Sequence, residues 1–236
     1  MIKKSSATES LSRETVVDRA LALADAEGLE AVTIRRLGQD FGVTPMALYW
    51  HVKNKDELLD AMGDRIFADL HYESEPGASW DEQLRAVVRG LVDMLRRHPT
   101  CLQLAFRRVF ACPEGRQLAE HTFGLLRRAG FSPRRTADIA SHALQTAVML
   151  VSAEPGAEPG RSAEDVEAML AQKRAGLELL PIDEYPYIRE MAGDMLFCDD
   201  MSDYYGFGID VFVAGARAML GDAEPAPRRR RAQSIA

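Results

Sequence analysis

The stretch from Thr33 to Lys55, TIRRLGQDFGVTPMALYWHVKNK, constrains the fold more than any other part of this chain. Thr33 and Thr44 each precede a short apolar run, where a threonine hydroxyl is suited to cap a helix. Pro45 follows Thr44 at the first helical position, where its missing N–H costs nothing. Between the two runs, Gly42 permits a sharp turn. Apolar side chains should lock the two helices from inside: Leu37, Val43 and Leu48. This pattern predicts a helix-turn-helix.

The charge of this motif differs from the charge of the whole chain. The chain has a formal net charge of -7 and a sequence pI near 5.3, which argues against a polybasic nucleic-acid binder. Between Thr33 and Lys55, however, only Asp40 is acidic, and the basic residues are Arg35, Arg36, Lys53 and Lys55. Tyr49, Trp50 and His51 add N–H and O–H groups that can bond phosphate oxygens. The motif therefore predicts a locally basic face suited to a phosphate backbone.

Helical periodicity extends through the readable chain, and no stretch alternates convincingly as a strand. The predicted fold class is all-α. Ser12 should cap a helix that ends at Gly28, and Asn54 should cap another that continues to Leu70. The two helices of the motif are expected at 34–41 and 46–51. Longer helices are expected at 80–98, 100–110, 113–130, 132–154, 162–180, 183–197 and 200–220.

Breaks in this pattern divide the chain. The segment 73–79, ESEPGAS, separates an N-terminal helix-turn-helix domain at 11–72 from a larger helical domain at 80–221. Residues 1–10 are polar and are expected to be mobile, as is the loop at 155–161. The tail at 222–236 is Pro-rich, then basic at Arg228–Arg231, and is expected to be disordered. That basic run is interpreted as solvated, with non-specific DNA attraction as the alternative.

Composition indicates an ordinary soluble globular protein. Hydrophobic residues make up 47% of the chain and charged residues 28%, so a sizeable core is possible. No signal peptide and no membrane-length apolar run is visible, so the expected location is the cytoplasm. Cys101, Cys112 and Cys198 lack CxxC spacing and are interpreted as reduced, buried thiols. No GxSxG, P-loop or HExxH motif is present, so the chain is not expected to be an enzyme.

The residues from Glu27 to Met62, EGLEAVTIRRLGQDFGVTPMALYWHVKNKDELLDAM, resemble the DNA-binding domain of the TetR family of transcriptional regulators. The resemblance covers about 11–70, with a weaker one to the tetracycline-repressor-type helical domain over 80–220. It implies that Arg35 and the start of the second motif helix face base edges, while ring and lysine side chains hold phosphates. The implied DNA-contacting set is Thr33, Arg35, Thr44, Pro45, Met46, Ala47, Tyr49, Trp50, His51 and Lys55.

One departure from the family pattern affects the DNA sequence that would be bound. Pro45 stands where tetracycline repressors carry a base-reading glutamine, so few polar groups remain for direct readout. Arg35 suits a guanine, and Met46 or Ala47 suits a thymine methyl. The operator should therefore differ from the tetracycline operator.

A small reader of this kind recognises few base pairs, so a twofold homodimer on a palindromic operator is expected. The candidate dimerisation helices are 132–154 and 200–220, which are apolar over more of their circumference than a surface helix requires. Gly208, Gly215 and Ala216 would permit close helix approach. Paired with their symmetry mates, the two helices would form a four-helix bundle. Burial within one protomer is the alternative for either helix.

The larger domain should also hold a small-molecule pocket. Its expected lining is His71, Leu91, Met94, Leu95, Leu104, Phe106, Phe110, His121, Leu125 and Met149. Taken singly, each of these side chains is more often a core residue. By the resemblance, Ala105 replaces the histidine that holds a drug–metal chelate in tetracycline repressors, His71 matches a drug-contacting histidine, and Val87 and Leu91 replace a polar contact and an aromatic. The sequence therefore predicts an apolar effector, no metal and no cofactor.

The function that follows is a repressor released from its palindromic operator by a small apolar effector, without contact with a membrane. An activator of the same family is the first alternative, because the sign of regulation depends on operator position. A small-molecule carrier with an incidental helix-turn-helix is the second. The effector, the operator sequence and the regulated genes are not encoded in any motif of the chain.

Overall fold

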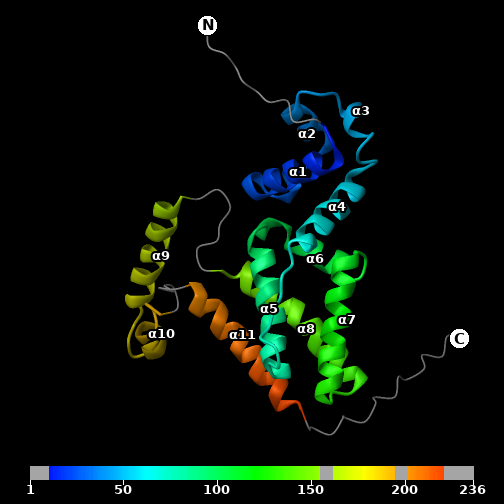
Figure 1. Ribbon diagram of the computed structural model, residues 1–236. Helices are drawn as coiled ribbons and strands as arrows, with labels where there is room; N and C mark the ends of the chain where they lie inside the picture. The colour runs from blue at the N-terminus through cyan, green and yellow to red at the C-terminus, as the bar shows by residue number, and fades with distance from the viewer. Residues whose placement is uncertain (1–10, 155–161, 195–200, 221–236) are drawn as a thin grey trace, which may run out of the picture.

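The computed structural model describes residues 11–154, 162–194 and 201–220, which form helices and turns without a strand (Figure 1). The all-α prediction is confirmed for these residues. The helices are α1 (Arg13–Glu27), α2 (Ile34–Phe41), α3 (Pro45–Leu48), α4 (Lys55–Ala68), α5 (Trp80–Arg96), α6 (Leu102–Arg108), α7 (Pro113–Ala129), α8 (Pro133–Ser152), α9 (Ala163–Glu178), α10 (Pro186–Glu190) and α11 (Met201–Ala218), with 3-10 turns η1 (Leu29–Ala31) and η2 (Pro99–Cys101).

Several expectations lie outside the described residues. These are the mobility of 1–10 and of the loop at 155–161, the disorder of the tail at 222–236, the thiol of Cys198 and the basic run Arg228–Arg231. Cys101 and Cys112 are described, and both are buried free thiols, as predicted.

The N-terminal unit, α1 to α3, lies at one end of the molecule (Figure 1). Ser12 caps α1 as predicted: its hydroxyl accepts the Thr15 N–H at 3.1 Å, and the Thr15 hydroxyl accepts the Ser12 N–H at 2.9 Å. Gly28, with φ of +88°, ends α1. Apolar side chains of α1 point into the core beneath the motif, where Val16, Ala20 and Ala24 are fully buried.

The helical bundle comprises α5, α6, α7, α8 and α11, with α5 packed against α7, α8 and α11. Two ion pairs join α5 to α11, Arg85 with Asp210 and Arg217 with Asp81, and the Asp81 side chain is almost completely buried. One hydrophobic cluster runs without interruption from Val16 of α1 to Val213 of α11. The N-terminal unit and the bundle therefore share a core.

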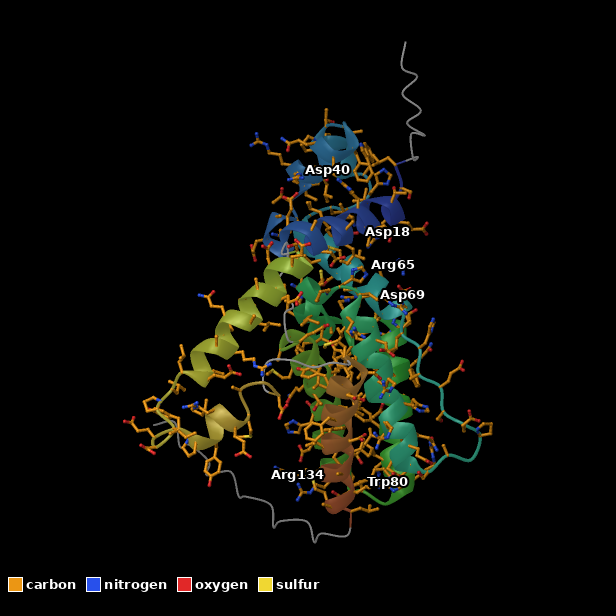
Figure 2. The ribbon with its side chains drawn as sticks, turned by 90° about the vertical axis from the view of Figure 1, so that its left-hand side faces the viewer. Asp18, Asp40, Arg65, Asp69, Trp80 and Arg134 are labelled. Atoms are coloured by element: carbon orange, nitrogen blue, oxygen red, sulfur yellow. The ribbon has the colours of Figure 1, made fainter. Side chains whose placement is uncertain are left out.

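Polar contacts strengthen the junction between these two parts. Arg65 of α4 reaches Asp18 of α1 at 3.2 Å and Asp69, the C-cap of α4, at 2.7 Å, and all three lie together beside the top of the bundle (Figure 2). Arg97 approaches Asp69 at 3.3 Å from the end of α5. Burial alone would raise the pKa of Asp69, but the hydrogen bonds and charges of Arg65 and Arg97 together outweigh burial, and the pKa lies below its usual value.

A second polar junction joins α1 to η2. Nδ1 of His98 lies 2.8 Å from a carboxylate oxygen of Asp25, and the Thr100 hydroxyl lies 3.4 Å from the other oxygen. The beginning of α6 is therefore tied to α1, so the N-terminal unit is held from two sides.

Helices α9 and α10 stand apart from the bundle and pack mainly against each other (Figure 1). The predicted helix at 183–197 is wrong: only Pro186–Glu190 is helical, 191–194 form turns, and 195–197 lie outside the described residues. Pro186 disfavours helical backbone at Tyr185 and so prevents an earlier start. No helix in the described ranges is long and apolar enough to cross a membrane.

Two further helices are shorter than predicted. The helix expected at 46–51 is the single turn α3. After it the chain forms a tighter turn, in which the His51 N–H donates to the Leu48 carbonyl at 2.9 Å. The helix expected at 100–110 begins as the 3-10 turn η2 and becomes α-helical only at Leu102.

Candidate nucleic-acid interface and effector cavity

The helix-turn-helix forms, and of its two predicted threonine caps Thr33 makes the expected side-chain hydrogen bond. The Thr33 hydroxyl accepts the Arg36 N–H at 3.1 Å, and Gly42 adopts the left-handed conformation with φ of +67°. Gly38 lets the two helices approach closely, because a β-carbon there would lie 3.1 Å from the Val43 carbonyl oxygen. Beneath the turn, Leu37 and Leu48 are fully buried. The sequence thus fixes the position of α3 relative to α2.

The structure brings the expected base-facing residues to the surface. Thr44 and Pro45 are exposed, Met46 is 69% exposed, and Ala47 is half-buried. Thr44 caps α3 by its backbone position alone, since its hydroxyl makes no capping hydrogen bond. Together these four residues form a short protruding stub, which we call the α3 stub.

Arg35 and Arg36, two neighbouring residues of α2, differ in whether their side chains are already held by other residues of the protein. Arg35 is exposed, and its side chain has no ion pair or hydrogen bond among the described residues. Arg36 is instead held by both carboxylate oxygens of Glu27, at 2.9 and 2.8 Å, and by Asp40 at 3.1 Å. Hydrogen bonds to Asp40 and then to Glu27 raise the pKa of Arg36. Arg36 therefore stabilises the N-terminal unit and adds little free positive charge to its surface.

The expected phosphate-binding residues flank the α3 stub. Tyr49 is 45% and Trp50 86% exposed, His51 is half-buried, and Lys55 is exposed at the start of α4. The predicted residues Thr44–Ala47, Tyr49–His51 and Lys55 thus follow one another along the chain from the α3 stub to the start of α4. Arg35 lies on α2, and Thr33 uses its hydroxyl to cap α2.

Glu57 is a component of this surface whose contacts the sequence did not show. Its carboxylate accepts the Lys53 backbone N–H at 2.9 Å and pairs with Arg13 of α1 at 2.8 Å. The Lys53 N–H is the largest cause that lowers the pKa of Glu57. Asn54 caps α4 by accepting the Glu57 N–H at 2.8 Å, as predicted. A cap followed three residues later by glutamate is the sequence signal that could have indicated a role for Glu57 at the start of α4.

A cavity of about 380 Å³ lies among α5, α7, α8 and the end of α6. Its lining is almost entirely apolar and consists of Val87, Leu91, Phe106, Val109, Phe110, Leu118, Ala119, Thr122, Phe123, Ala137, Ala140, Ser141, Ala143 and Leu144. This volume falls within the range of small-molecule sites. Phe106 and Phe110 are 48% and 64% exposed, so the cavity has an open side.

Only part of the predicted lining reaches this cavity: Leu91, Phe106 and Phe110. Four other predicted residues are instead buried in the core: Met94, Leu95, Leu104 and Leu125. They lie on helix faces that pack against neighbouring helices and do not line the cavity.

The remaining three predicted lining residues also lie elsewhere. His71 borders a separate, more polar groove formed by the segment between α4 and α5. The His121 ring packs against Tyr72, with ring centroids 5.0 Å apart, and burial followed by the charge of Arg128 lowers its pKa. Met149 is 62% exposed on α8. These three are therefore not brought together with the cavity.

Thr122 and Ser141 are cavity residues that the sequence reasoning missed. Thr122 is only 4% exposed, and its hydroxyl donates to the Leu118 carbonyl at 2.8 Å, which leaves its lone pairs able to accept. Ser141 lies on the exposed side of α8. The charged residues of the described chain lie outside this lining, and no cluster of metal-ligating side chains occurs among the described residues.

The cavity is joined to α4 through α6. Phe106 lines the cavity, and the next two residues face α4: Arg107 reaches Asp60 at 3.1 Å, and Arg108 reaches Asp64 at 2.7 Å and Asp60 at 3.3 Å. Val109 and Phe110 then return to the cavity wall. A displacement of these aromatic walls would therefore act on the ion pairs that hold α4.

Each candidate dimerisation helix has one buried and one exposed apolar face. Within the protomer, α8 buries Ile139, Ala143, Leu144, Ala147 and Val151, and α11 buries Ile209, Val213 and Ala216. Their outer faces expose Met149, Phe207 and Val211, and Met219 and Leu220 are exposed just after the end of α11. The two helices pack closely at Gly208, where a β-carbon would lie 2.3 Å from Leu150 Cδ2. Burial in the protomer thus accounts for only part of their apolar surface.

This architecture defines a helix-turn-helix regulator with a helical companion domain, and comparisons with known proteins identify the family. The family model described as "Bacterial regulatory proteins, tetR family" matches residues 16–62. The model described as "Tetracyclin repressor-like, C-terminal domain" matches residues 73–220. The chain belongs to the TetR family.

Similar proteins include a repressor of comparable length, the HTH-type transcriptional repressor DrrR1 of Streptomyces coeruleorubidus. It is 29% identical over 234 residues, which cover 92% of this chain and 82% of DrrR1. The class D tetracycline repressor of Escherichia coli is 47% identical over 77 residues, only 32% of this chain and 35% of that protein. The crystal structure of ActR from Streptomyces coelicolor with actinorhodin has a TM-score of 0.73 and 28% identity, covering 90% of this chain and 99% of ActR.

Proposed function

We propose that this protein is a homodimeric transcriptional repressor that binds a palindromic operator and is released from it by a small apolar effector. The observation that carries the proposal is the α3 stub, exposed beside Tyr49, Trp50 and Lys55 and connected through α4 and α6 to an apolar cavity. The DNA-binding domain would comprise 11–72, and the sensing and dimerisation domain 80–221. Repression is supported by the similarity to DrrR1, and ligand response by the ActR complex with actinorhodin.

In this proposal the α3 stub enters the major groove, while Tyr49, Trp50, His51 and Lys55 hold the phosphates beside it. The outer faces of α8 and α11 pair with their symmetry mates and form a four-helix bundle. Dimerisation would place two stubs about 34–36 Å apart or a multiple of that distance, one helical turn of B-form DNA.

Release follows from the contacts between the cavity and α4. An effector between α7 and α8 presses on Phe106 and Phe110, shifts α6, and alters the pairs of Arg107 and Arg108 with Asp60 and Asp64. Because α4 carries the N-terminal unit, its rotation changes the spacing of the two stubs. A coupling of about 1–3 kcal/mol, roughly 5- to 150-fold in operator affinity, is typical of such links.

DNA binding is tested by fluorescence anisotropy with duplexes selected from a random library. Lys55→Ala should weaken binding to all selected duplexes and reduce the slope of log affinity against log salt by about 1, since one phosphate contact is lost. Lys173→Ala is the matched control, because Lys173 is exposed on α9, outside the predicted DNA-contacting residues. Indifference of binding to Lys55→Ala, or failure to select any duplex, would favour the carrier alternative.

Effector binding is tested by a thermal-shift screen of apolar small molecules, followed by operator release with each hit. Thr122→Val should weaken molecules that carry a hydrogen-bond donor and leave purely apolar ones unchanged, because it removes the buried hydroxyl without changing the shape of the wall. Leu179→Ala, at an 83% exposed position outside the cavity, serves as control. Hits that stabilise the protein without lowering operator affinity would contradict the proposed link. A reporter gene with the operator then separates repression from activation.

A further inference from the structure

The outward surface of the α3 stub is apolar. Pro45 is exposed and has no N–H, Met46 is 69% exposed, and Ala47 is half-buried. The polar atom among these side chains is the hydroxyl of Thr44, and the same side chain also carries a methyl group. A stub of this composition offers almost no hydrogen bonds to the bases.

The stub is also held firmly in place. Leu48 beneath it is fully buried, and Gly38 allows α2 to approach the turn so closely that a β-carbon would crowd the Val43 carbonyl at 3.1 Å. The backbone therefore cannot retreat easily from a base that it does not fit. Met46, with its unbranched and flexible side chain, is the part that adapts its shape to the groove.

The chemistry of the major groove then determines the preferred base. Adenine, guanine and cytosine present only hydrogen-bond donors and acceptors there, whereas thymine also presents its C5-methyl group. An apolar side chain pressed against a donor or acceptor removes its water and gives no bond in return, which is unfavourable. Against a methyl group, the same side chain removes apolar surface from water.

We propose that the α3 stub recognises its operator through thymine methyl groups, with Met46 as the main specificity-determining residue. This inference rests on the proposed function, since it requires the stub to lie in the major groove. Each half-site should contain at least one thymine whose methyl group contacts Met46, next to the position read by Arg35. Loss of one such methyl should weaken binding about fourfold, the effect of burying one methyl-sized group.

The experiment uses the full-length protein and duplexes selected from a random library. Each thymine of the selected half-site is replaced in turn by deoxyuridine, which removes only the methyl group. At the contacted position, affinity should fall about fourfold. There, 5-methyldeoxycytidine should in turn bind more tightly than deoxycytidine by a similar factor, because that pair also differs by one methyl.

Variants of Met46 test whether the loss of affinity on removing the thymine methyl group depends on this side chain. Met46→Ala should reduce the thymine-to-deoxyuridine ratio toward one, and Met46→Leu, which keeps apolar surface, should retain most of it. Met191→Ala is the matched control, since Met191 is similarly exposed, at 45%, just after α10. A ratio unchanged in Met46→Ala would overturn the assignment to Met46.

Two failures are distinguishable. If the protein binds selected duplexes tightly but no deoxyuridine substitution changes its affinity, methyl readout is overturned while the proposed function stands. If no duplex is selected at all, the proposed function is overturned and the inference with it.

Discussion

The close contact between α4 and α6 determines whether a larger side chain at Gly63 raises or lowers the free energy of unfolding. Gly63 lies within α4 where Arg108 crosses it, and a methyl group at Gly63 would lie 2.4 Å from Arg108 Cγ and 3.4 Å from Leu104 Cβ. The Arg108 side chain cannot move aside freely, because Asp64 and Asp60 hold its guanidinium at 2.7 and 3.3 Å. Gly63→Ala should therefore disturb this contact.

Two opposing effects set the magnitude. Replacing glycine by alanine within a helix stabilises by about 1 kcal/mol, and overpacking a close contact costs about 1–3 kcal/mol. Gly63→Ala should thus lower the free energy of unfolding, by up to about 2 kcal/mol. In an Arg108→Ala background the crowding atom is gone, so the same change should raise the free energy of unfolding by up to about 1 kcal/mol. The predicted reversal of sign is a coupling between neighbours.

The assay is urea unfolding at a fixed protein concentration, followed by circular dichroism at 222 nm. Gly124→Ala is the matched control, because its nearest neighbour is the mobile end of Arg128, at 3.0 Å, and it should stabilise the protein or leave it unchanged. An effect of the same sign and size with and without the Arg108 side chain would refute the reasoning. It would mean that α4 and α6 do not pack as closely as the structure shows.

Two further predictions concern the N-terminal unit. Burial would raise the pKa of Asp40, but hydrogen bonds from Arg36 and Arg19 lower it overall, so the carboxylate contributes stability that is lost as pH falls through its depressed pKa. Asp40→Asn should therefore lower the free energy of unfolding at neutral pH. The difference in free energy of unfolding between variant and wild type should shrink below about pH 4, and urea unfolding measured across pH checks this. Arg36→Ala should destabilise the protein, whereas Arg35→Ala should change the free energy of unfolding by less than about 0.5 kcal/mol and yet weaken binding to selected duplexes. Equal effects of the two arginine variants on stability would contradict this distinction.

Local signals in the sequence were sufficient for the helix-turn-helix. Thr33, Gly42 and Pro45 act within a few residues of themselves, and each has the conformation or capping role that its chemistry predicts. The partners of Arg36 were not predictable in the same way. Glu27 belongs to α1, and the contact depends on how α1 and α2 cross.

The lining of the cavity was also hard to predict from the sequence, because it too depends on how the helices pack. Leu91 and Leu95 are separated by one helical turn on the same apolar stripe of α5, yet Leu91 lines the cavity and Leu95 does not. The helical periodicity predicts that both side chains face inward. Whether a cavity lies opposite a side chain depends instead on how α7 and α8 pack against α5, which periodicity does not show. Thr122 was missed for a related reason, because its hydroxyl bonds its own helix and so resembles an ordinary buried threonine.

The continuous core also predicts how the protein unfolds. Hydrophobic contacts run from Val16 in α1 through Met62 in α4 to Val213 in α11, so the N-terminal unit and the bundle should unfold together. Trp80 lies at the far end of α5 from that unit and packs edge-on against Phe131, with ring centroids 5.3 Å apart (Figure 2).

Because the chain contains two tryptophans, Trp50→Phe leaves Trp80 as a single fluorescent probe of the bundle. Its fluorescence and the circular dichroism at 222 nm, which reports all helices, should change at the same urea concentration. Loss of more helix signal than α9 and α10 together can account for, before Trp80 responds, would show that the N-terminal unit unfolds alone. In that case the shared core would be too weak to transmit a shift of α6 as rigid motion of α4, and the release mechanism would need a flexible connection instead.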